Sequence, residues 1–137
     1  MEIRYPALLK PEEGGYYVEF VDLPDTFTEG KTLEEALFNA SEVLTAMLNW
    51  RMDEGQDIPN PSGEVAGAIY VAPDAKTQSA LLIRRTRGAR PLADLARVLE
   101  TSWPAAKRLE DPRHWPSLKQ LDKAAAALGK RLMLSFE

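Results

Sequence analysis

Apolar and polar positions alternate over the first thirty residues, and this period of two predicts β-strands. We expect strands over residues 2–10, 16–21 and 26–29, with a turn at Glu12–Gly15 that makes a hairpin of the first two. Pro6 lacks a backbone N–H group, so it predicts an edge or bulge position for the first strand. The apolar side chains expected on one face of that strand are Ile3, Tyr5, Ala7 and Leu9.

The pattern then changes to a helical period. Thr32 and Glu35 have the Thr-x-x-Glu spacing of a capping box, which predicts the start of a long helix that ends near Gly55. Phe38 lies off the apolar stripe of this helix and is expected to contact a loop or a partner. A fourth strand is expected over residues 65–71. The stripe, which we expect to be core, comprises Leu33, Ala36, Leu37, Ala40, Val43, Leu44, Met47 and Leu48.

The pattern is helical beyond Pro73-Asp74. Residues 132–136 alternate again, as a short terminal strand would. The fold class expected is therefore α+β, with a β-β-β-α-β domain over residues 1–72 and an all-helical domain over residues 73–137. The helices predicted in the second domain span residues 75–87, 91–99, 102–109 and 117–128.

Composition narrows the class of protein. The chain has 137 residues and no cysteine, which excludes disulfides, cysteine-ligated zinc and thiol catalysis. No stretch approaches the roughly 20 apolar residues that a membrane helix needs, and the N-terminus does not have the pattern of a signal peptide. A cytoplasmic protein without a membrane partner is expected. Because each predicted domain is small, self-association into at least a dimer is expected as well.

The formal net charge of −4 conceals two opposite halves. Residues 1–73 carry four basic and 14 acidic side chains, a net charge of −10, whereas residues 74–137 carry 13 basic and 7 acidic ones, a net charge of +6. This asymmetry predicts different partners for the two halves. A phosphate backbone suits the basic half, and a basic protein suits the acidic half, unless the acidic surface is merely solvated.

Two short helices in the basic half have helix-turn-helix spacing, with the small Ala96 where they would touch. The second helix of such a pair presents its N-terminal side chains to the major groove of DNA. Against this hypothesis, the turn has Glu100 where such turns usually have glycine, and the pair is equally consistent with two packing helices that expose a basic face. The candidate DNA-binding residues are Ser102 as N-cap, Trp103, Lys107 and Arg108 on the second helix, and Arg113 and Lys119 at phosphates.

Enzymatic chemistry has little support in the residues. A metal-dependent nuclease needs several converging carboxylates, and only Glu19 and Asp22 are close in the acidic half. His114 is the only histidine, and it follows a turn. We therefore expect no enzyme, no catalytic residues, no metal and no cofactor, and keep a metal-dependent nuclease as a third hypothesis.

Several segments together resemble one family, that of the HicB antitoxins, in its helix-turn-helix form. The resemblance covers nearly the whole chain, and the order and spacing of the N-terminal segments are its specific part. These segments are Gly14-Gly15-Tyr16-Tyr17-Val18-Glu19-Phe20, Asp22-Leu23-Pro24, Phe27-Thr28-Glu29-Gly30, Thr32-Leu33-Glu34-Glu35-Ala36 and Ile58-Pro59, then Asp94-Leu95-Ala96, Arg108-Leu109, Asp111-Pro112-Arg113-His114 and Leu128-Gly129-Lys130.

The resemblance implies a partial ribonuclease-H-like N-terminal domain without catalytic carboxylates. It implies that this domain neutralises HicA, a small basic mRNA interferase toxin, and that the second domain binds operator DNA and represses its own operon as a homodimer or homotetramer. Charge or expected exposure makes four residues the toxin-binding candidates: Glu19, Asp22, Leu23 and Phe38. The alternative is a stand-alone helix-turn-helix transcriptional regulator whose acidic domain oligomerises or senses a ligand.

Overall fold

The computed structural model describes all residues, Met1–Glu137, and divides the chain into two compact units. Unit 1 is Met1–Asp74 and unit 2 is Ala75–Glu137. The chain as a whole is of mixed α and β structure, as the sequence predicts.

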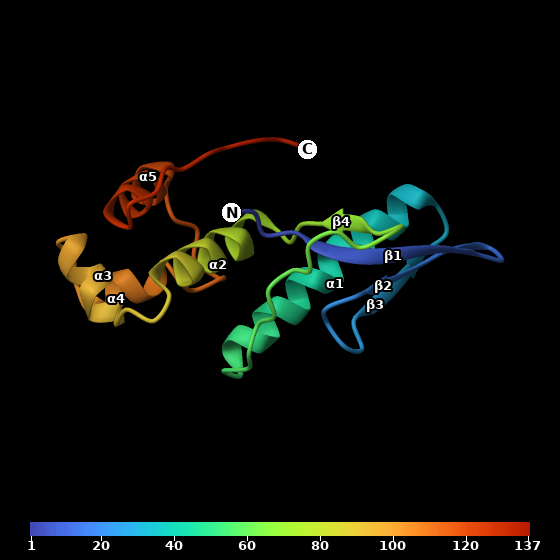
Figure 1. Cartoon of the computed structure of the whole chain (residues 1–137), viewed down its shortest axis with the longest axis horizontal. Coiled ribbons are helices and arrows are strands. Elements are labelled where there is room, and N and C mark those ends of the chain that lie inside the picture. The colour runs from blue at the N-terminus through green and yellow to red at the C-terminus, as the bar shows by residue number, and fades with distance from the viewer. The chain divides into compact units, whose positions relative to one another are not determined.

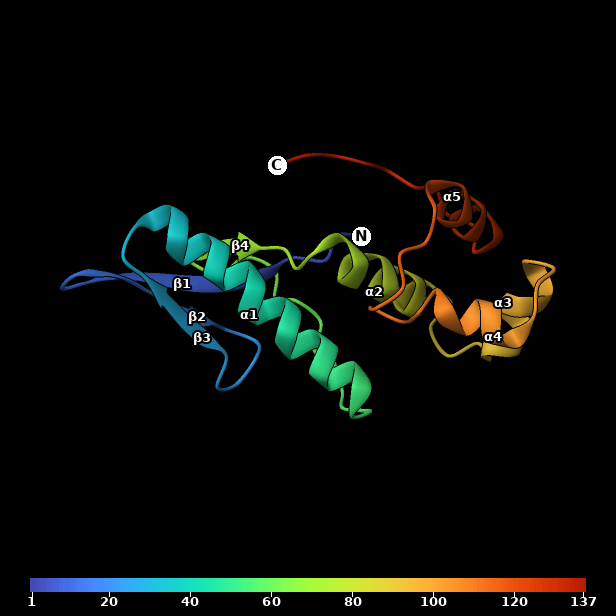
Figure 2. The ribbon, with the colours of Figure 1, turned by 180° about the vertical axis from the view of Figure 1, so that it is seen from behind.

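Unit 1 is a four-stranded antiparallel sheet with one long helix packed across it (Figure 1). Figure 2 shows the helix from its outer side, in front of the strands. The strand order is β3-β2-β1-β4. The predicted hairpin is confirmed, because Glu12 pairs with Gly15 and Gly14 has φ +83° in the two-residue turn. The elements are β1 (Tyr5–Glu12), β2 (Gly15–Phe20), β3 (Phe27–Gly30), α1 (Leu33–Asp53) and β4 (Ile69–Val71).

The edge position expected from Pro6 is wrong. Pro6 lies in β1, which is a central strand paired with both β2 and β4. The proline is tolerated because it stands beyond the last paired position of the β1–β2 ladder, Ala7 opposite Phe20. Its carbonyl still accepts a hydrogen bond from Val21 N at 3.1 Å, so only one ladder bond is lost.

Helix α1 begins where the sequence predicts. Thr32 is the N-cap, and its side chain accepts a hydrogen bond from Glu35 N at 3.1 Å. The buried residues of α1 recur at every fourth position, namely Ala36, Ala40, Leu44, Leu48 and Met52. The expected burial of Leu33 and Leu37 is wrong, since these side chains are 44% and 38% exposed. The apolar stripe in the sequence is wider than the strip of helix that the sheet covers.

Two glycines allow α1 and β2 to approach β3. A Cβ atom on Gly30 would lie 2.4 Å from Ala36 N, in the first turns of α1. A Cβ atom on Gly15 would lie 2.2 Å from Gly30 O. Only residues without a side chain fit at these two positions, so the sequence here fixes the distance between helix and sheet edge.

Unit 2 consists of four helices around a small core. The four predicted helices are confirmed, the first with the predicted bounds and the other three slightly shorter: α2 (Ala75–Arg87), α3 (Leu92–Val98), α4 (Trp103–Arg108) and α5 (Leu118–Ala127). Ser117 and Gln120 form a complete capping box at the start of α5. The expected terminal strand over residues 132–136 is not formed in the single chain. The core cluster comprises Ile83, Leu95, Ala96, Leu99, Ala106, Leu109 and Ala124.

Candidate functional site

A tight turn joins α3 to α4 in unit 2. Leu99 ends α3, and the chain reverses through Glu100, whose φ is +53°. Thr101 N donates to Ala96 O at 2.9 Å and Glu100 N donates to Arg97 O at 3.1 Å, which is the hydrogen-bond pattern of a Schellman motif. Ser102 then caps α4, since its side chain accepts from Ala105 N at 3.2 Å. The turn therefore has the left-handed residue expected there, although it is not glycine.

Small buried side chains set the packing of these helices. Ala96 on α3 is 7% exposed, and Ala106 on α4 is fully buried. With α4 held by Ala106, its opposite side faces solvent. Trp103 is 49% exposed, and Lys107 places its Nζ atom 5.1 Å from the centre of the Trp103 ring. Arg108 is also exposed.

The remaining DNA-binding candidates lie on the surface after α4. Arg113 is exposed, and its guanidinium lies 3.4 Å from Asp111 Oδ1. Lys119 is exposed in the first turn of α5. All six predicted DNA-binding residues are thus at the surface of unit 2.

Two basic residues of α2, Arg84 and Arg87, bind a buried glutamate. Arg87 of α2 donates to both carboxylate oxygens of Glu110, at 2.5 and 2.8 Å, and Arg84 donates to Glu110 O at 3.1 Å. Glu110 is only 6% exposed. The hydrogen bonds and charge of Glu110 raise the pKa of Arg87 above its usual value, although partial burial opposes this. Sequence reasoning missed this ion pair because a count of charges does not reveal which ones face inward.

A second lysine–tryptophan pair lies in unit 2. Lys76 places its Nζ atom 5.1 Å from the centre of the Trp115 ring, and Trp115 is 66% exposed. Trp115 was not among the predicted residues. Its position in a loop between His114 and Pro116, outside any apolar periodicity, was the available signal.

The acidic candidates of unit 1 have different surroundings. Asp22 accepts two hydrogen bonds from Ser62, from the backbone N at 2.8 Å and from the hydroxyl at 2.5 Å. This carboxylate therefore fastens the long connection before β4 to the β2–β3 turn. Glu19 is exposed and lies 3.9 Å from Lys10 Nζ. The expected exposure of Leu23 is wrong, because this side chain is completely buried.

Phe38 is the most exposed aromatic side chain of α1, at 65%. On a helix, residues three and four positions away are its surface neighbours. For Phe38 these include Glu34, Glu35 and Glu42, which are all exposed. We call these four residues the Phe38 patch. An aromatic ring framed by three carboxylates is suited to a partner that is both basic and partly apolar.

Sequence reasoning missed other exposed aromatic residues of unit 1. Phe27 on the edge strand β3 is 53% exposed, and its ring centre lies 5.8 Å from that of Tyr17. Partial burial, together with Glu19 and Glu12, raises the pKa of Tyr17. Trp50 near the end of α1 is also 53% exposed. The first turns of α1 lie against β3, since Asn39 donates to Glu29 O at 2.9 Å.

The hypothesis of a metal-dependent nuclease finds no suitable cluster. No group of three or more histidine, aspartate or glutamate side chains is arranged to hold a metal ion. Asp22, the carboxylate on which that hypothesis depends, is hydrogen-bonded to Ser62. None of the helices is long and apolar enough to span a membrane.

Comparison of the sequence with known proteins identifies the family of this chain. Residues 4–77 match the model of the HicB-like antitoxin of bacterial toxin–antitoxin systems. The chain is 32% identical over 137 residues to Antitoxin HicB 1 of Photorhabdus laumondii, with 98% of this chain and 88% of that protein covered. It is 30% identical over 135 residues to Antitoxin HicB of Escherichia coli K12, with 96% and 98% covered. The chain therefore belongs to the HicB-like antitoxin family, the antitoxin component of toxin–antitoxin systems.

Proposed function

We propose that unit 1 binds and neutralises a HicA-type mRNA interferase toxin, and that unit 2 binds operator DNA and represses the operon. One observation carries this proposal. Unit 1 has four basic and 15 acidic residues, a net charge of −11, whereas unit 2 has 13 basic and 6 acidic residues, a net charge of +7. Opposite charges on two separate units suit two partners of opposite charge.

The Phe38 patch is the proposed centre of toxin binding. Interface energy concentrates in a few aromatic or arginine anchors, and a basic enzyme that binds RNA is complementary to the surrounding carboxylates. Glu19 extends the acidic surface. Asp22 shapes it through Ser62, and Leu23 supports the β2–β3 turn from within. We propose that unit 1 is a partial ribonuclease-H-like domain that acts by covering the toxin rather than by catalysis.

We propose that α3 and α4 form a helix-turn-helix, with α4 as the helix that enters the major groove. Trp103, Lys107 and Arg108 lie on the exposed side of α4, and we propose that Arg113 and Lys119, which are also exposed, contact phosphates. A protein of this kind binds as a homodimer or homotetramer, with half-sites about one helical turn apart.

The decisive experiment measures RNA cleavage by the small basic protein encoded beside this gene. We expect the full chain to suppress cleavage at near-equimolar ratio. Undiminished cleavage in the presence of excess chain overturns the antitoxin role of unit 1. A gel-shift assay with the DNA upstream of the gene tests unit 2 separately, and a shift without toxin inhibition is the result expected of a stand-alone regulator.

A further inference from the structure

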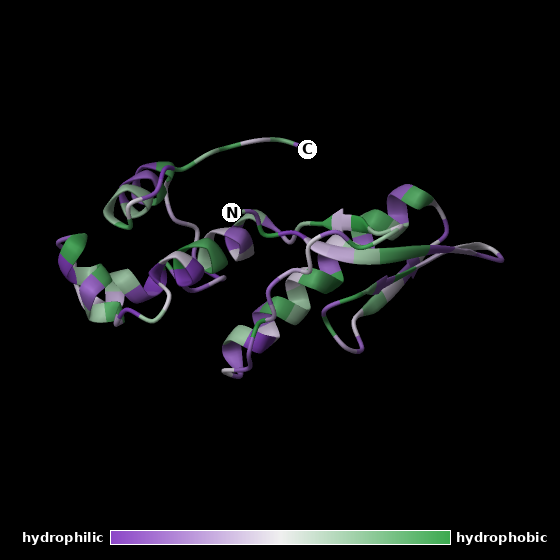
Figure 3. Ribbon diagram, in the orientation of Figure 1, coloured by the Kyte–Doolittle hydropathy of each residue, from purple (hydrophilic) through white to green (hydrophobic).

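The last residues of unit 2 expose an unusual amount of apolar side chain. Helix α5 ends at Ala127 with Leu128 as its C-cap, Gly129 follows with φ +75°, and Lys130 N donates to Ala125 O at 2.8 Å. Residues 130–137 then form neither helix nor strand. Exposed apolar side chains grouped in this way mark a site of association. The exposed fractions are 82% for Met133, 68% for Leu134 and 107% for Phe136, and Figure 3 colours much of this tail as hydrophobic.

The order of residues in the tail is that of a strand with one apolar face. In extended backbone, successive side chains point to opposite sides. Leu132, Leu134 and Phe136 would share one side, and the other side would carry the polar residues together with Met133. A single strand has no partner for its backbone hydrogen bonds and is not stable alone. The tail therefore has a strand pattern that the isolated chain does not satisfy.

We propose that the tail, residues 130–137, pairs in an antiparallel ribbon with the same segment of a second copy of this chain. The ribbon is centred on Leu134, which lies opposite Leu134 of the second copy. Arg131 then lies opposite Glu137, Leu132 opposite Phe136, and Met133 opposite Ser135. This inference gives the proposed dimer a specific interface, and it requires neither toxin nor DNA.

Charge selects this direction of pairing. The basic residues Lys130 and Arg131 stand at one end of the tail and the acidic Glu137 stands at the other. In the antiparallel ribbon, unlike charges face each other at both ends, which favours pairing. A parallel ribbon in register would place Arg131 against Arg131 and Glu137 against Glu137, and like charges directly opposite each other disfavour it.

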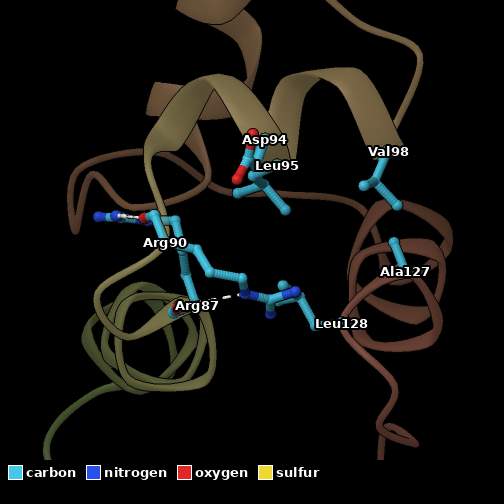
Figure 4. Close-up of a pocket in the computed structure, with 7 residues that line it drawn as sticks. All are labelled: Arg87, Arg90, Asp94, Leu95, Val98, Ala127 and Leu128. Carbon is cyan, nitrogen blue, oxygen red and sulfur yellow. Dashed lines mark hydrogen bonds between the residues drawn. The ribbon is translucent and has the colours of Figure 1, made fainter.

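The apolar face of the ribbon has a surface on which to lie. The tail leaves α5 next to a small hollow. Its lining combines the apolar side chains of Leu95, Val98, Ala127 and Leu128 with the charged side chains of Arg87, Arg90 and Asp94. Figure 4 shows Val98 of α3 and Ala127 of α5 pointing toward one another across it. Val98 is 43% exposed in the single chain. Two tails together supply six apolar side chains to this face of the ribbon.

Disulfide cross-linking tests the register, because the chain contains no cysteine that would interfere. The full-length variants Met133→Cys and Ser135→Cys are oxidised separately and as an equimolar mixture. Both substitutions are in the exposed tail and leave the folded units unchanged. Directly opposite residues of an antiparallel pair have Cα atoms about 4.5–5.5 Å apart, within the range of a disulfide.

We expect the mixture to yield at least about fivefold more cross-linked dimer than either variant alone. The reason is that position 133 of one copy lies directly opposite position 135 of the other, whereas neither position lies opposite itself. Absent cross-links, or equal yields in the three samples, overturn the proposal.

Charge exchange provides a second, independent test by sedimentation equilibrium of the full chain. Arg131→Glu and Glu137→Arg should each weaken self-association about tenfold, since each places like charges opposite one another at both ends of the ribbon. The double variant should restore it. A double variant as weak as either single variant overturns the antiparallel register. These measurements are made without toxin or DNA, so their failure and the failure of the proposed function are distinguishable.

Discussion

The two units of this chain are stabilised in different ways. Unit 1 places a 21-residue helix on a four-stranded sheet, and its core includes large side chains such as Tyr5, Leu44 and Leu48 that are fully buried. Unit 2 packs helices of 6 to 13 residues, and three of its seven core residues are alanines. In unit 2 an ion pair between Arg87 and Glu110 also joins α2 to the segment that follows α4.

The two units also differ in where their carboxylates lie. In unit 1 the carboxylates around Phe38 lie outside the core, whereas in unit 2 the carboxylate of Glu110 lies within it. A surface charge alters binding, and a buried charge alters folding.

Loss of the Glu110 carboxylate should destabilise unit 2 most. Glu110→Ala leaves the partly buried Arg87 without its bidentate partner. Removing one member of a buried pair typically costs about 3–5 kcal/mol, and the partial exposure of Arg87 places this case near the lower end. Hydrogen exchange should show faster opening of α2 and α4 and no change in the sheet. Asp94→Ala, which removes an exposed pair with Arg97 at 3.9 Å, is the control and should change stability by less than about 0.5 kcal/mol.

The substitution Gly30→Ala should destabilise unit 1. The new Cβ would lie 2.4 Å from Ala36 N and 2.7 Å from Ala36 Cα, and both are backbone atoms that cannot rotate away. Overpacking of this kind costs about 1–3 kcal/mol, and we expect the upper part of this range. Gly63→Ala is the control, since no atom lies within 4 Å of a Cβ at that position. Equal unfolding midpoints for the two variants in urea would contradict the close packing of α1 on β3.

Much of this architecture is predictable from sequence because local chemistry determines it. Thr32 and Ser117 mark helix starts through short-range hydrogen bonds, and Gly14 marks the hairpin turn through its φ angle. Burial is less predictable, because it depends on which parts of the chain meet. Leu37 and Leu23 have the same side chain, yet Leu37 on α1 is exposed, whereas Leu23 in the β2–β3 turn is completely buried.

In the candidate site too, some features follow from the local sequence and others depend on distant parts of the chain. The exposure of Lys107 and Arg108 follows from the period of a short helix with Ala106 on its buried side. The role of Asp22 does not follow from any local pattern, because its partner Ser62 is 40 positions away. Likewise, no local pattern indicates that Arg87 meets Glu110, 23 residues later.

Truncation of Phe38 should weaken toxin binding without affecting the fold. An exposed aromatic anchor at the centre of an interface contributes about 2 kcal/mol, so Phe38→Ala should raise the dissociation constant of the toxin complex roughly 30-fold. Trp50→Ala is the matched control, because Trp50 is a similarly exposed aromatic residue of the same helix outside the Phe38 patch. Titration calorimetry measures both. Equal effects of the two variants would remove the patch from the interface.

Removal of Lys107 should weaken operator binding and leave toxin binding unchanged. If this ammonium group contacts a base, Lys107→Ala costs about 1–3 kcal/mol in DNA affinity, with reduced discrimination at one base position. If it contacts a phosphate, the loss is uniform across sequences and the salt dependence decreases. Lys10→Ala removes a lysine from unit 1 and is the control. A gel-shift affinity equal to that of the original chain would exclude α4 from the DNA interface.

The smallest predicted effect is a gain in stability at the turn of unit 2. Glu100 and Gly129 occupy the same place in two helix ends, since each follows the C-cap residue and has positive φ, at 53° and 75°. A residue with a Cβ is strained in this conformation and glycine is not. Glu100→Gly should therefore raise the free energy of unfolding of unit 2 by about 0.5–1 kcal/mol, offset in part by the greater freedom of the unfolded chain. Gly129→Ala should lower it by a similar amount. Urea unfolding followed by hydrogen exchange in α3 and α5 measures both changes. If Glu100→Gly destabilises unit 2 instead, the Glu100 side chain makes a stabilising contact that outweighs its backbone strain.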